Sequence, residues 1–435
     1  MFVLLITVFL LLLISMLLNK KDISSPSFIF TLSFCFSCIW ATIYEKNWSL
    51  NLHKNTFFVI AGGITVFIIT SQITHIVSRI RIAQKTKINN KLKEINIEKL
   101  KKYIFIIIEI FTIAFTIYMI LKLTGLGISS LSTAIYKFRY NNVFTENETL
   151  KFPKILSLLR IFVLSLGYYF SYISINNYIT NKKIDILDII LIIGSIVSYI
   201  LTGARTGAIN MLLACLAIFI ILLNKKNSFT NKINLKLIFK IMCIAIIILL
   251  LFQKIGASLG RNVDSYNSID YLALYCGAEI KNLDTFLQEQ NMNNSRIWNS
   301  QSFIYMVQWI GPKLGIENTK YQLYLPFRRI NGYGLGNVYT TFYPYIYDFG
   351  YKGMIILVML MSLISQFFYE KAKKSYKKLY PNIYLLIYSY IFGSLVLSFF
   401  SNKFYEQNFN KQFVYMIIIW NFLNLFCCKI KIKIK

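Results

Sequence analysis

Three groups of arginines pose the first chemical question in this sequence. Arg205 stands in LTGARTGAIN between two apolar stretches, Arg261 lies in SLGRNVD, and Arg328 and Arg329 lie in PFRR. A guanidinium stays charged at physiological pH, and its planar fork of N–H donors matches two phosphate oxygens. The pattern therefore indicates a phosphate or diphosphate site, if folding brings these arginines to one surface. The alternative is that each contacts lipid headgroups or a nearby carboxylate.

Two carboxylates are candidates for accepting or positioning a proton. Asp348 lies just before an apolar stretch, and Glu279 lies in a segment with helical patterning at 266–290. Asp348 could instead be a helix N-cap, and Glu279 could belong to a solvated helix face. We keep both alternatives open.

The stretch 331–353, NGYGLGNVYTTFYPYIYDFGYKG, combines alternating glycines with aromatic residues. Glycines let backbone N–H groups approach an anion, but they also shape turns. Asn337 and Tyr339 follow the glycines, and we include both as candidate glycan-binding residues. Most of the aromatic residues are expected to form a belt at the membrane interface.

The sequence gives no support for histidine or metal chemistry. His53 and His75 are the only two histidines, and both lie outside the longest polar segment. The seven cysteines fall mostly in or beside apolar stretches, so we interpret them as packing residues rather than metal ligands. We therefore predict no cofactor and no metal.

The elements that must position these residues are membrane helices. Hydrophobic residues make up 56% of the 435 residues, and they occur in blocks long enough to cross a hydrocarbon core. We predict an all-α polytopic integral membrane protein with about eleven transmembrane helices, the first interpreted as a retained helix rather than a signal peptide. The predicted spans are 2–18, 27–44, 57–77, 104–123, 158–178, 187–202, 207–224, 237–253, 350–369, 381–400 and 412–427.

Basic residues predict the orientation of these spans. Loops on the predicted cytoplasmic side carry 26 Lys and Arg in 72 residues, against 17 in 157 on the other side. The N-terminus is then outside and the C-terminus cytoplasmic. The net charge of +29 is explained by this placement, without a nucleic-acid partner.

One outer loop, residues 254–349, is much longer than the others. It is rich in aromatic residues and carries eight basic and seven acidic residues, so it is nearly neutral. A loop of this length is more often functional than a linker. We predict a single membrane domain, 1–435, that includes this partly helical loop.

This combination resembles the O-antigen polymerase (Wzy) family of oligosaccharide repeat-unit polymerases. The resemblance rests on the arginine in TGARTG, on the large outer loop and on its closing NVYTTFYPYIYDFGYKG. It implies a glycosyltransferase of the bacterial inner membrane, of the multi-spanning class that uses polyprenyl-linked donors. Its substrates would be undecaprenyl-diphosphate-linked glycans, polymerised on the outer face of the membrane into O-antigen or capsule.

The resemblance also gives the arginines and carboxylates expected roles. Arg205 would be the leading diphosphate ligand, helped by Arg261, Arg328 and Arg329, while Asp348 or Glu279 would receive the acceptor's proton. A chain-length regulator and a flippase are candidate protein partners, in addition to the surrounding lipid bilayer. The alternatives are an O-antigen ligase-type transferase, a lipid-linked oligosaccharide flippase or transporter, and a membrane scaffold without enzymatic activity.

Overall fold

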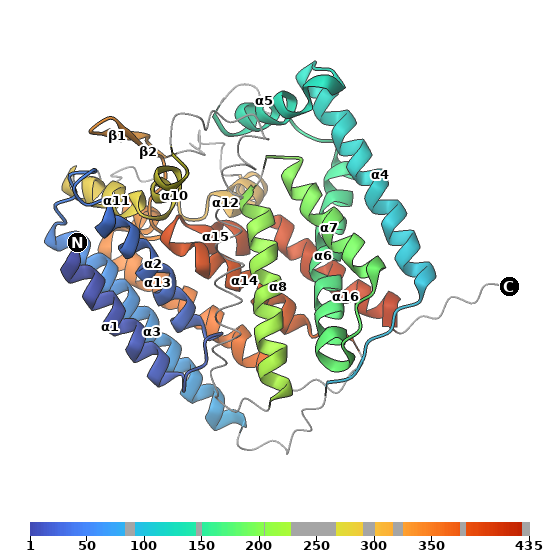
Figure 1. Cartoon of the computed structure of the whole chain (residues 1–435), viewed down its shortest axis with the longest axis horizontal. Coiled ribbons are helices and arrows are strands. Elements are labelled where there is room, and N and C mark those ends of the chain that lie inside the picture. Colours follow the sequence, from blue (N-terminus) through green and yellow to red (C-terminus); the bar gives the residue numbers. More distant parts are fainter. Residues whose placement is uncertain are drawn as a thin grey trace.

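The chain folds into a bundle of membrane-length helices (Figure 1). The structure is a computed structural model, and it describes residues 1–82, 92–144, 150–203, 205–227, 267–289, 301–315, 325–374 and 380–428. Seven of the described helices are long and apolar enough to cross a membrane, and three shorter apolar helices accompany them. The protein is therefore a polytopic helical membrane protein.

Ten of the eleven predicted spans coincide with helices of the structure. The remaining span, 237–253, lies outside the described residues, so the total of eleven stays a prediction. The ten helices are α1 (Phe2–Leu18), α2 (Pro26–Ile43), α3 (Lys54–Ile82), α4 (Lys99–Thr124), α6 (Lys154–Asn181), α7 (Ile186–Ile200), α8 (Arg205–Lys226), α13 (Phe342–Lys373), α14 (Ile383–Val396, continued by the 3₁₀ turn Leu397–Phe399) and α16 (Lys411–Cys428).

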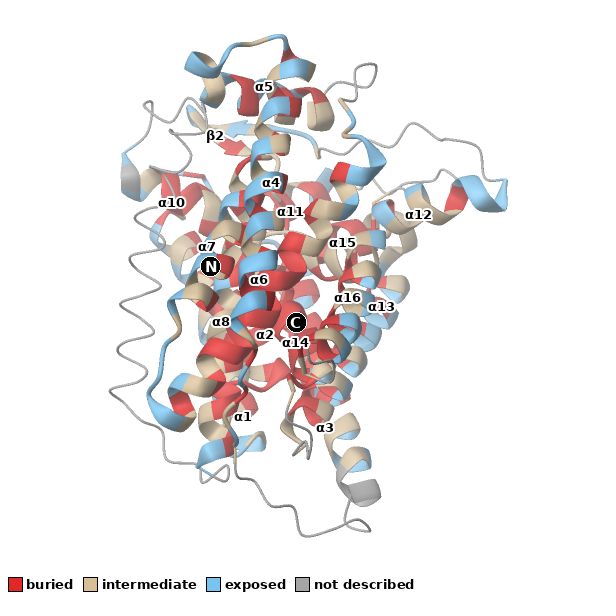
Figure 2. Cartoon of the chain, turned by 90° about the vertical axis from the view of Figure 1, so that its right-hand side faces the viewer, coloured by how far each residue is buried: buried red, intermediate tan, exposed pale blue. Residues whose placement is uncertain are grey.

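These helices pack in two groups that meet at α14. Helix α3 packs along α13 and α1 packs along α2, while α6 packs against α7, α8 and α16. Helix α14 packs against α2 and α13 on one side and against α8 on the other. Buried residues line the middle of the bundle along α6, α2 and α14 (Figure 2).

Shorter elements gather at one end of the bundle, at the top of Figure 1, which we call the loop end. They are α5 (Leu131–Phe144), α10 (Ser268–Cys276), α11 (Ala278–Glu289), α12 (Ile304–Ile310) and the hairpin β1 (Arg328–Ile330) with β2 (Tyr333–Gly336); α15 (Lys403–Asn408) lies beside α14. The helical pattern at 266–290 forms two helices, α10 and α11, that are separated at Gly277. A Cβ at Gly277 would lie 2.7 Å from the backbone nitrogen of Ala41, so this break seats the loop against α2.

The structure decides one open alternative about the stretch 331–353 and corrects one expectation. Asn331 (φ 49°) and Gly332 (φ 78°) both take the left-handed conformation and form the turn between β1 and β2, whereas Gly334 and Gly336 lie on β2. The aromatic residues are not an interfacial belt, because the first part of α13, from Phe342 to its break at Gly350 (φ 65°), precedes the predicted span at 350–369 and packs most of them inward. Tyr339, Phe342, Tyr343 and Tyr345 are each at most 5% exposed.

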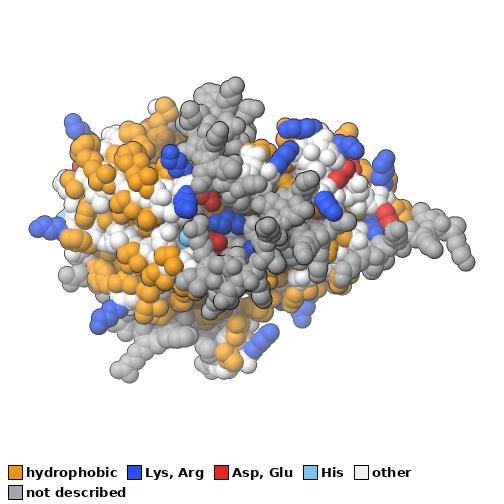
Figure 3. All heavy atoms as spheres, turned by 90° about the horizontal axis from the view of Figure 1, so that it is seen from below, with side chains coloured by type: hydrophobic (Ala, Val, Ile, Leu, Met, Phe, Trp, Pro, Cys, Tyr) orange, Lys and Arg blue, Asp and Glu red, His pale blue; other side chains and the backbone are white. Residues whose placement is uncertain are grey.

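Viewed from the opposite end, the molecule presents Lys and Arg side chains around its face, with fewer acidic ones (Figure 3). Such a distribution is expected for a cytoplasmic surface. The orientation of the chain remains a prediction.

Candidate functional site

The turn that joins α7 to α8 gathers three arginines at the loop end. Arg205 is the first residue of α8 and is 5% exposed. Arg160, on α6, donates from Nη2 to the Ser198 carbonyl oxygen at 3.0 Å and to the Thr202 hydroxyl at 3.3 Å. Arg139, on α5, packs on the turn from the other side, where its Cδ lies 2.8 Å from the position of a Cβ on Gly203. We call these three residues the arginine turn.

Glycine at position 203 permits this arrangement for two reasons. Its φ of +68° is a conformation that a side chain disfavours, and a Cβ would collide with Arg139. Gly203 therefore shapes this turn, whereas Gly207 lies within α8 and packs against Tyr199.

Arg205 is held by the large loop. Its Nη1 and Nη2 donate to the Tyr271 hydroxyl at 3.1 and 3.2 Å, and Nη2 donates to the Tyr275 hydroxyl at 3.4 Å. The guanidinium carbon also lies 5.7 Å from the centre of the Tyr275 ring. Burial raises the pKa of Tyr271, so this partner is a neutral phenol. These contacts orient the guanidinium.

The electrostatics of the arginine turn favour an anion. The N-terminus of α8 carries a partial positive charge, and the guanidinium of Arg205 adds to it at the same point. Arg160 is 8% exposed, and its Nη1 has no hydrogen-bond partner among the described residues. A buried donor without a partner costs free energy that an anionic ligand would recover.

The other predicted arginines do not join this cluster in the described part of the chain. Arg328 forms a two-pronged ion pair with Glu289, from Nη1 to Oε1 at 2.7 Å and from Nη2 to Oε2 at 2.5 Å, and its Nε donates to Tyr339 at 3.0 Å. Its fork is therefore occupied by protein, and the pairing with Glu289 raises its pKa. Tyr339 in turn donates to the Pro326 carbonyl, which gives it a structural role in the hairpin. The convergence of Arg205 with Arg328 that the sequence suggested is not seen.

Three further residues were predicted to bind the substrate. Arg329 is exposed on β1, and Asn337 is half-buried after β2. Arg261 lies outside the described residues. Their proposed roles stay predictions.

Asp348 has a structural task within the loop. It lies two residues before the non-helical Gly350 that divides α13, and it accepts the backbone N–H of Gln301 at 3.1 Å and of Ser302 at 2.6 Å. It ties the segment before α12 to α13.

Glu279 is buried, which differs from the solvated face that the sequence allowed. Its side chain is fully enclosed, and neither carboxylate oxygen has a hydrogen-bond partner in the described residues. Burial raises the pKa of Glu279 well above its ordinary value, because an enclosed site disfavours the charged carboxylate. Its role as a proton acceptor stays a prediction.

In the structure, His53 also contacts the large loop through Asp284, a contact that the sequence did not predict. Asp284 on α11 accepts the backbone N–H of His53 at 3.0 Å and the Thr56 hydroxyl at 2.6 Å, and its other oxygen lies 3.2 Å from Nδ1 of His53. Asp284 therefore caps the N-terminus of α3 from another helix. The two residues are separated by 231 positions, so no local pattern links them.

Over the described ranges, no group of three His, Cys, Asp or Glu side chains lies close enough to hold a metal ion. In comparisons with known proteins, no family model, no curated protein and no solved structure matches this chain. Helix length, hydropathy and packing nevertheless place it among the multi-pass helical membrane proteins.

Proposed function

We propose that the protein is a glycosyltransferase that joins undecaprenyl-diphosphate-linked repeat units into a bacterial surface polysaccharide. The observation that carries this proposal is the arginine turn. The Arg160 guanidinium donates to the short turn that joins α7 to α8, the aliphatic part of the Arg139 side chain packs on its Gly203, and Arg205 begins α8 directly after it. Tyr271 and Tyr275 of the large loop hold the Arg205 guanidinium. Such a site suits a diphosphate group at a membrane surface.

In the proposed reaction a hydroxyl of the incoming repeat unit attacks the anomeric carbon of the growing glycan. The new glycosidic C–O bond forms as the bond between that carbon and the lipid diphosphate breaks, and the diphosphate leaves with the electron pair. The hydroxyl proton passes to a carboxylate or to the departing diphosphate. Preorganised guanidiniums stabilise the negative charge that develops on the leaving group.

The geometry changes which residues we assign to this step. Arg205 stays the leading diphosphate ligand, and Arg160 and Arg139 replace Arg328 as its helpers, because the fork of Arg328 is occupied by Glu289. Asp348 is half-buried and Glu279 fully buried, so Asp348 is the more accessible proton acceptor of the two.

Complementation of a strain that lacks the protein tests this proposal. Arg205→Ala should shorten the polysaccharide to few repeat units at normal protein level. Arg205→Lys should be nearly as damaging, because a lysine cannot reproduce the two-pronged fork. Lys122→Ala is the matched control, since Lys122 is a cation at the end of α4 that lies 5.9 Å from the Tyr118 ring. Wild-type chain lengths with Arg205→Ala would contradict the proposal.

A flippase or transporter is a second candidate, and one observation favours it. Polar side chains connect α3 to α13 inside the bundle, where Ser71 donates to Gln366 at 2.8 Å, Gln366 donates to Glu370 at 2.8 Å and His75 lies 2.6 Å from Glu370. Ionisable residues within membrane spans often mark transport pathways. Transport of a lipid-linked oligosaccharide in vesicles without polymerisation would favour this candidate.

A further inference from the structure

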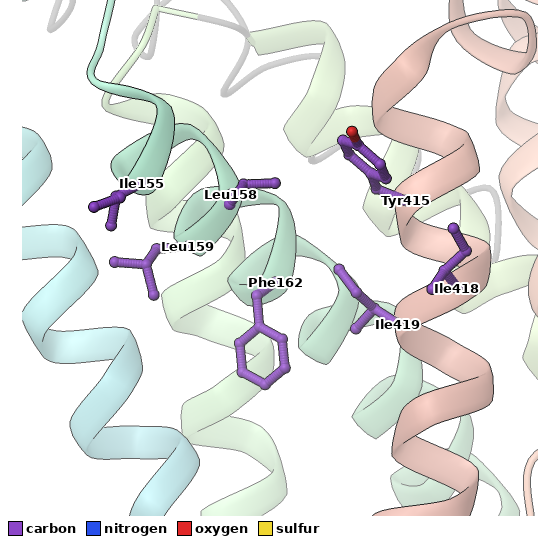
Figure 4. A pocket seen from close by; sticks show the side chains of 7 residues that line it. All are labelled: Ile155, Leu158, Leu159, Phe162, Tyr415, Ile418 and Ile419. Carbon is purple, nitrogen blue, oxygen red and sulfur yellow. The ribbon is translucent and has the colours of Figure 1, made fainter.

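An apolar groove runs between α6 and α16 on the side of the bundle. It has a volume of about 410 Å³, and Phe162 and Ile419 form its deeper end (Figure 4). Leu158 is 52% exposed and Ile418 is 58% exposed, so the groove opens sideways, toward the surrounding bilayer.

Each helix contributes one stripe of side chains to this region. Along α16 the stripe changes from a cation to an aromatic ring and then to aliphatic side chains, which is the order of polarity met on entering a bilayer. From its first to its last residue the stripe on α16 rises about 12 Å, which is within the ~15 Å of hydrocarbon in one leaflet. Both stripes have the spacing of one helix face: Ile155, Leu158, Leu159 and Phe162 on α6, and Lys411, Tyr415, Ile418 and Ile419 on α16.

A cationic and aromatic hollow of about 550 Å³ adjoins the groove at Tyr415, which lines both. It lies where α12 packs against α16. The hollow contains two lysines, each placed over an aromatic ring: Lys313 lies 5.6 Å from the centre of the Trp309 ring, and Lys411 lies 5.3 Å from the centre of the Tyr415 ring. Lysines and aromatic rings at the end of a membrane helix are typical of the level of the lipid headgroups.

The two lysines bring positive charge that the described part of the chain does not neutralise. No acidic side chain of the described residues lines the hollow, and neither lysine forms an ion pair with one of their carboxylates. Glu406 lies on α15, which packs against α12, but it is paired with Lys403 at 2.5 Å. The hollow is therefore complementary to an anionic group, and the apolar groove beside it is complementary to a hydrocarbon chain.

We propose that the groove and the hollow together bind an anionic phospholipid of the surrounding leaflet, of the phosphatidylglycerol type. The proposal assigns the head group to Lys313 and Lys411 and an acyl chain to Leu158, Phe162 and Ile419. Charge selects an anionic lipid over a zwitterionic one, because a choline head group would bring its own cation to the two lysines. The site needs only that the protein spans a bilayer, so it is independent of the proposed glycosyl transfer.

Lipid binding to the full-length protein in detergent tests the head-group assignment, with native mass spectrometry as the readout. Phosphatidylglycerol should bind roughly 25-fold more tightly than phosphatidylcholine with the same acyl chains, at about fivefold per lysine. Lys313→Gln/Lys411→Gln should remove this preference by weakening phosphatidylglycerol alone, whereas Lys313→Arg/Lys411→Arg keeps both charges and should retain it. Lys122→Ala is the matched control, because Lys122 also lies near a tyrosine ring, 5.9 Å from Tyr118, but outside the groove and the hollow.

The groove has a test of its own. Leu158→Trp/Ile418→Trp fills it and should weaken the binding of both lipids, whereas Ile107→Trp/Ile110→Trp on the exposed face of α4 should bind like the wild type. If the variants do not fold, a phosphatidylglycerol with a photoreactive acyl chain must label the wild-type chain within 155–162 or 415–419.

The proposal is overturned if the wild type binds the two lipids equally, if Lys313→Gln/Lys411→Gln keeps the preference, or if the photoreactive lipid labels only other segments. Tighter binding of undecaprenyl phosphate than of phosphatidylglycerol would assign the site to another lipid and would overturn it as well. None of these measurements involves glycan transfer, so their outcome is separate from that of the Arg205 complementation test.

Discussion

At the residue scale, Arg205 is the centre of the account, and the tyrosine that orients it is the most direct residue to test. Tyr271 accepts two hydrogen bonds from the guanidinium, and hydrogen bonds to charged groups contribute about 1.5–3 kcal/mol. Tyr271→Phe keeps the ring and removes the acceptor. We expect polymer formation to fall about tenfold or more, with little change in protein level, as measured by glycan profiles. Tyr136→Phe, an exposed tyrosine on α5, is the control.

Glu279 gives a prediction about pH. Its pKa is raised in the folded protein, so the folded state binds more protons than the unfolded state at pH values above about 4.5. The free energy of unfolding should therefore fall as pH rises, by up to about 1.4 kcal/mol per pH unit. Glutamine does not titrate, so Glu279→Gln removes this fall in the free energy of unfolding with rising pH. The variant should be more thermally stable than the wild type at pH 7–8, and the difference should shrink toward pH 5. If the difference in melting temperature between the two proteins is the same at every pH, the burial of this carboxyl is contradicted.

At the element scale, the turn between α7 and α8 contacts Arg139 and Arg160 and leads directly into Arg205. Gly203→Ala combines an unfavourable left-handed conformation, which costs about 1–2 kcal/mol, with a collision against Arg139. We expect shortened glycans and a modest fall in thermal stability. Gly125→Ala is the control, because Gly125 also has a positive φ (+69°) but has open space around the Cβ position. Equal glycan profiles for the two variants would mean that contact with Arg139 does not matter.

The membrane helices are predictable from the sequence, because an apolar stretch of this length is typical of a membrane-spanning helix. The stretch 104–123 became α4, Lys99–Thr124, and the stretch 158–178 became α6, Lys154–Asn181. The hairpin could also have been found, because Asn331–Gly332 between two short strands is a typical type I′ turn sequence. The alternating glycines alone do not distinguish such a turn from an anion-binding loop.

The composition of the site was less predictable, because it depends on contacts between distant segments. Arg205 is identifiable from its place between two predicted spans, but Arg160 lies inside the span 158–178 and Arg139 lies in the loop between the spans 104–123 and 158–178. Neither has a local signal, since each is defined by contact with the turn at 201–203. Arg328 was identified for its charge, and only the structure reveals that Glu289 occupies its fork.

At the scale of the whole molecule, the turn between α7 and α8 and the described helices of the large loop, α10, α11 and α12, lie at one end of the bundle (Figure 1). Such an arrangement suits an enzyme whose substrates stay anchored in the membrane while their heads react at its surface. The predicted orientation places this end on the outer face of the membrane, where the proposed substrates would be joined.

The glycan profile of a strain that lacks the protein tests the central claim most directly. A polymerase is needed to join repeat units but not to make or transfer a single one. We therefore predict that long chains disappear while the acceptor still carries one repeat unit, and that the wild-type gene, but not the Arg205→Ala variant, restores them. Loss of every glycan, including the single unit, or unchanged long chains would contradict the account.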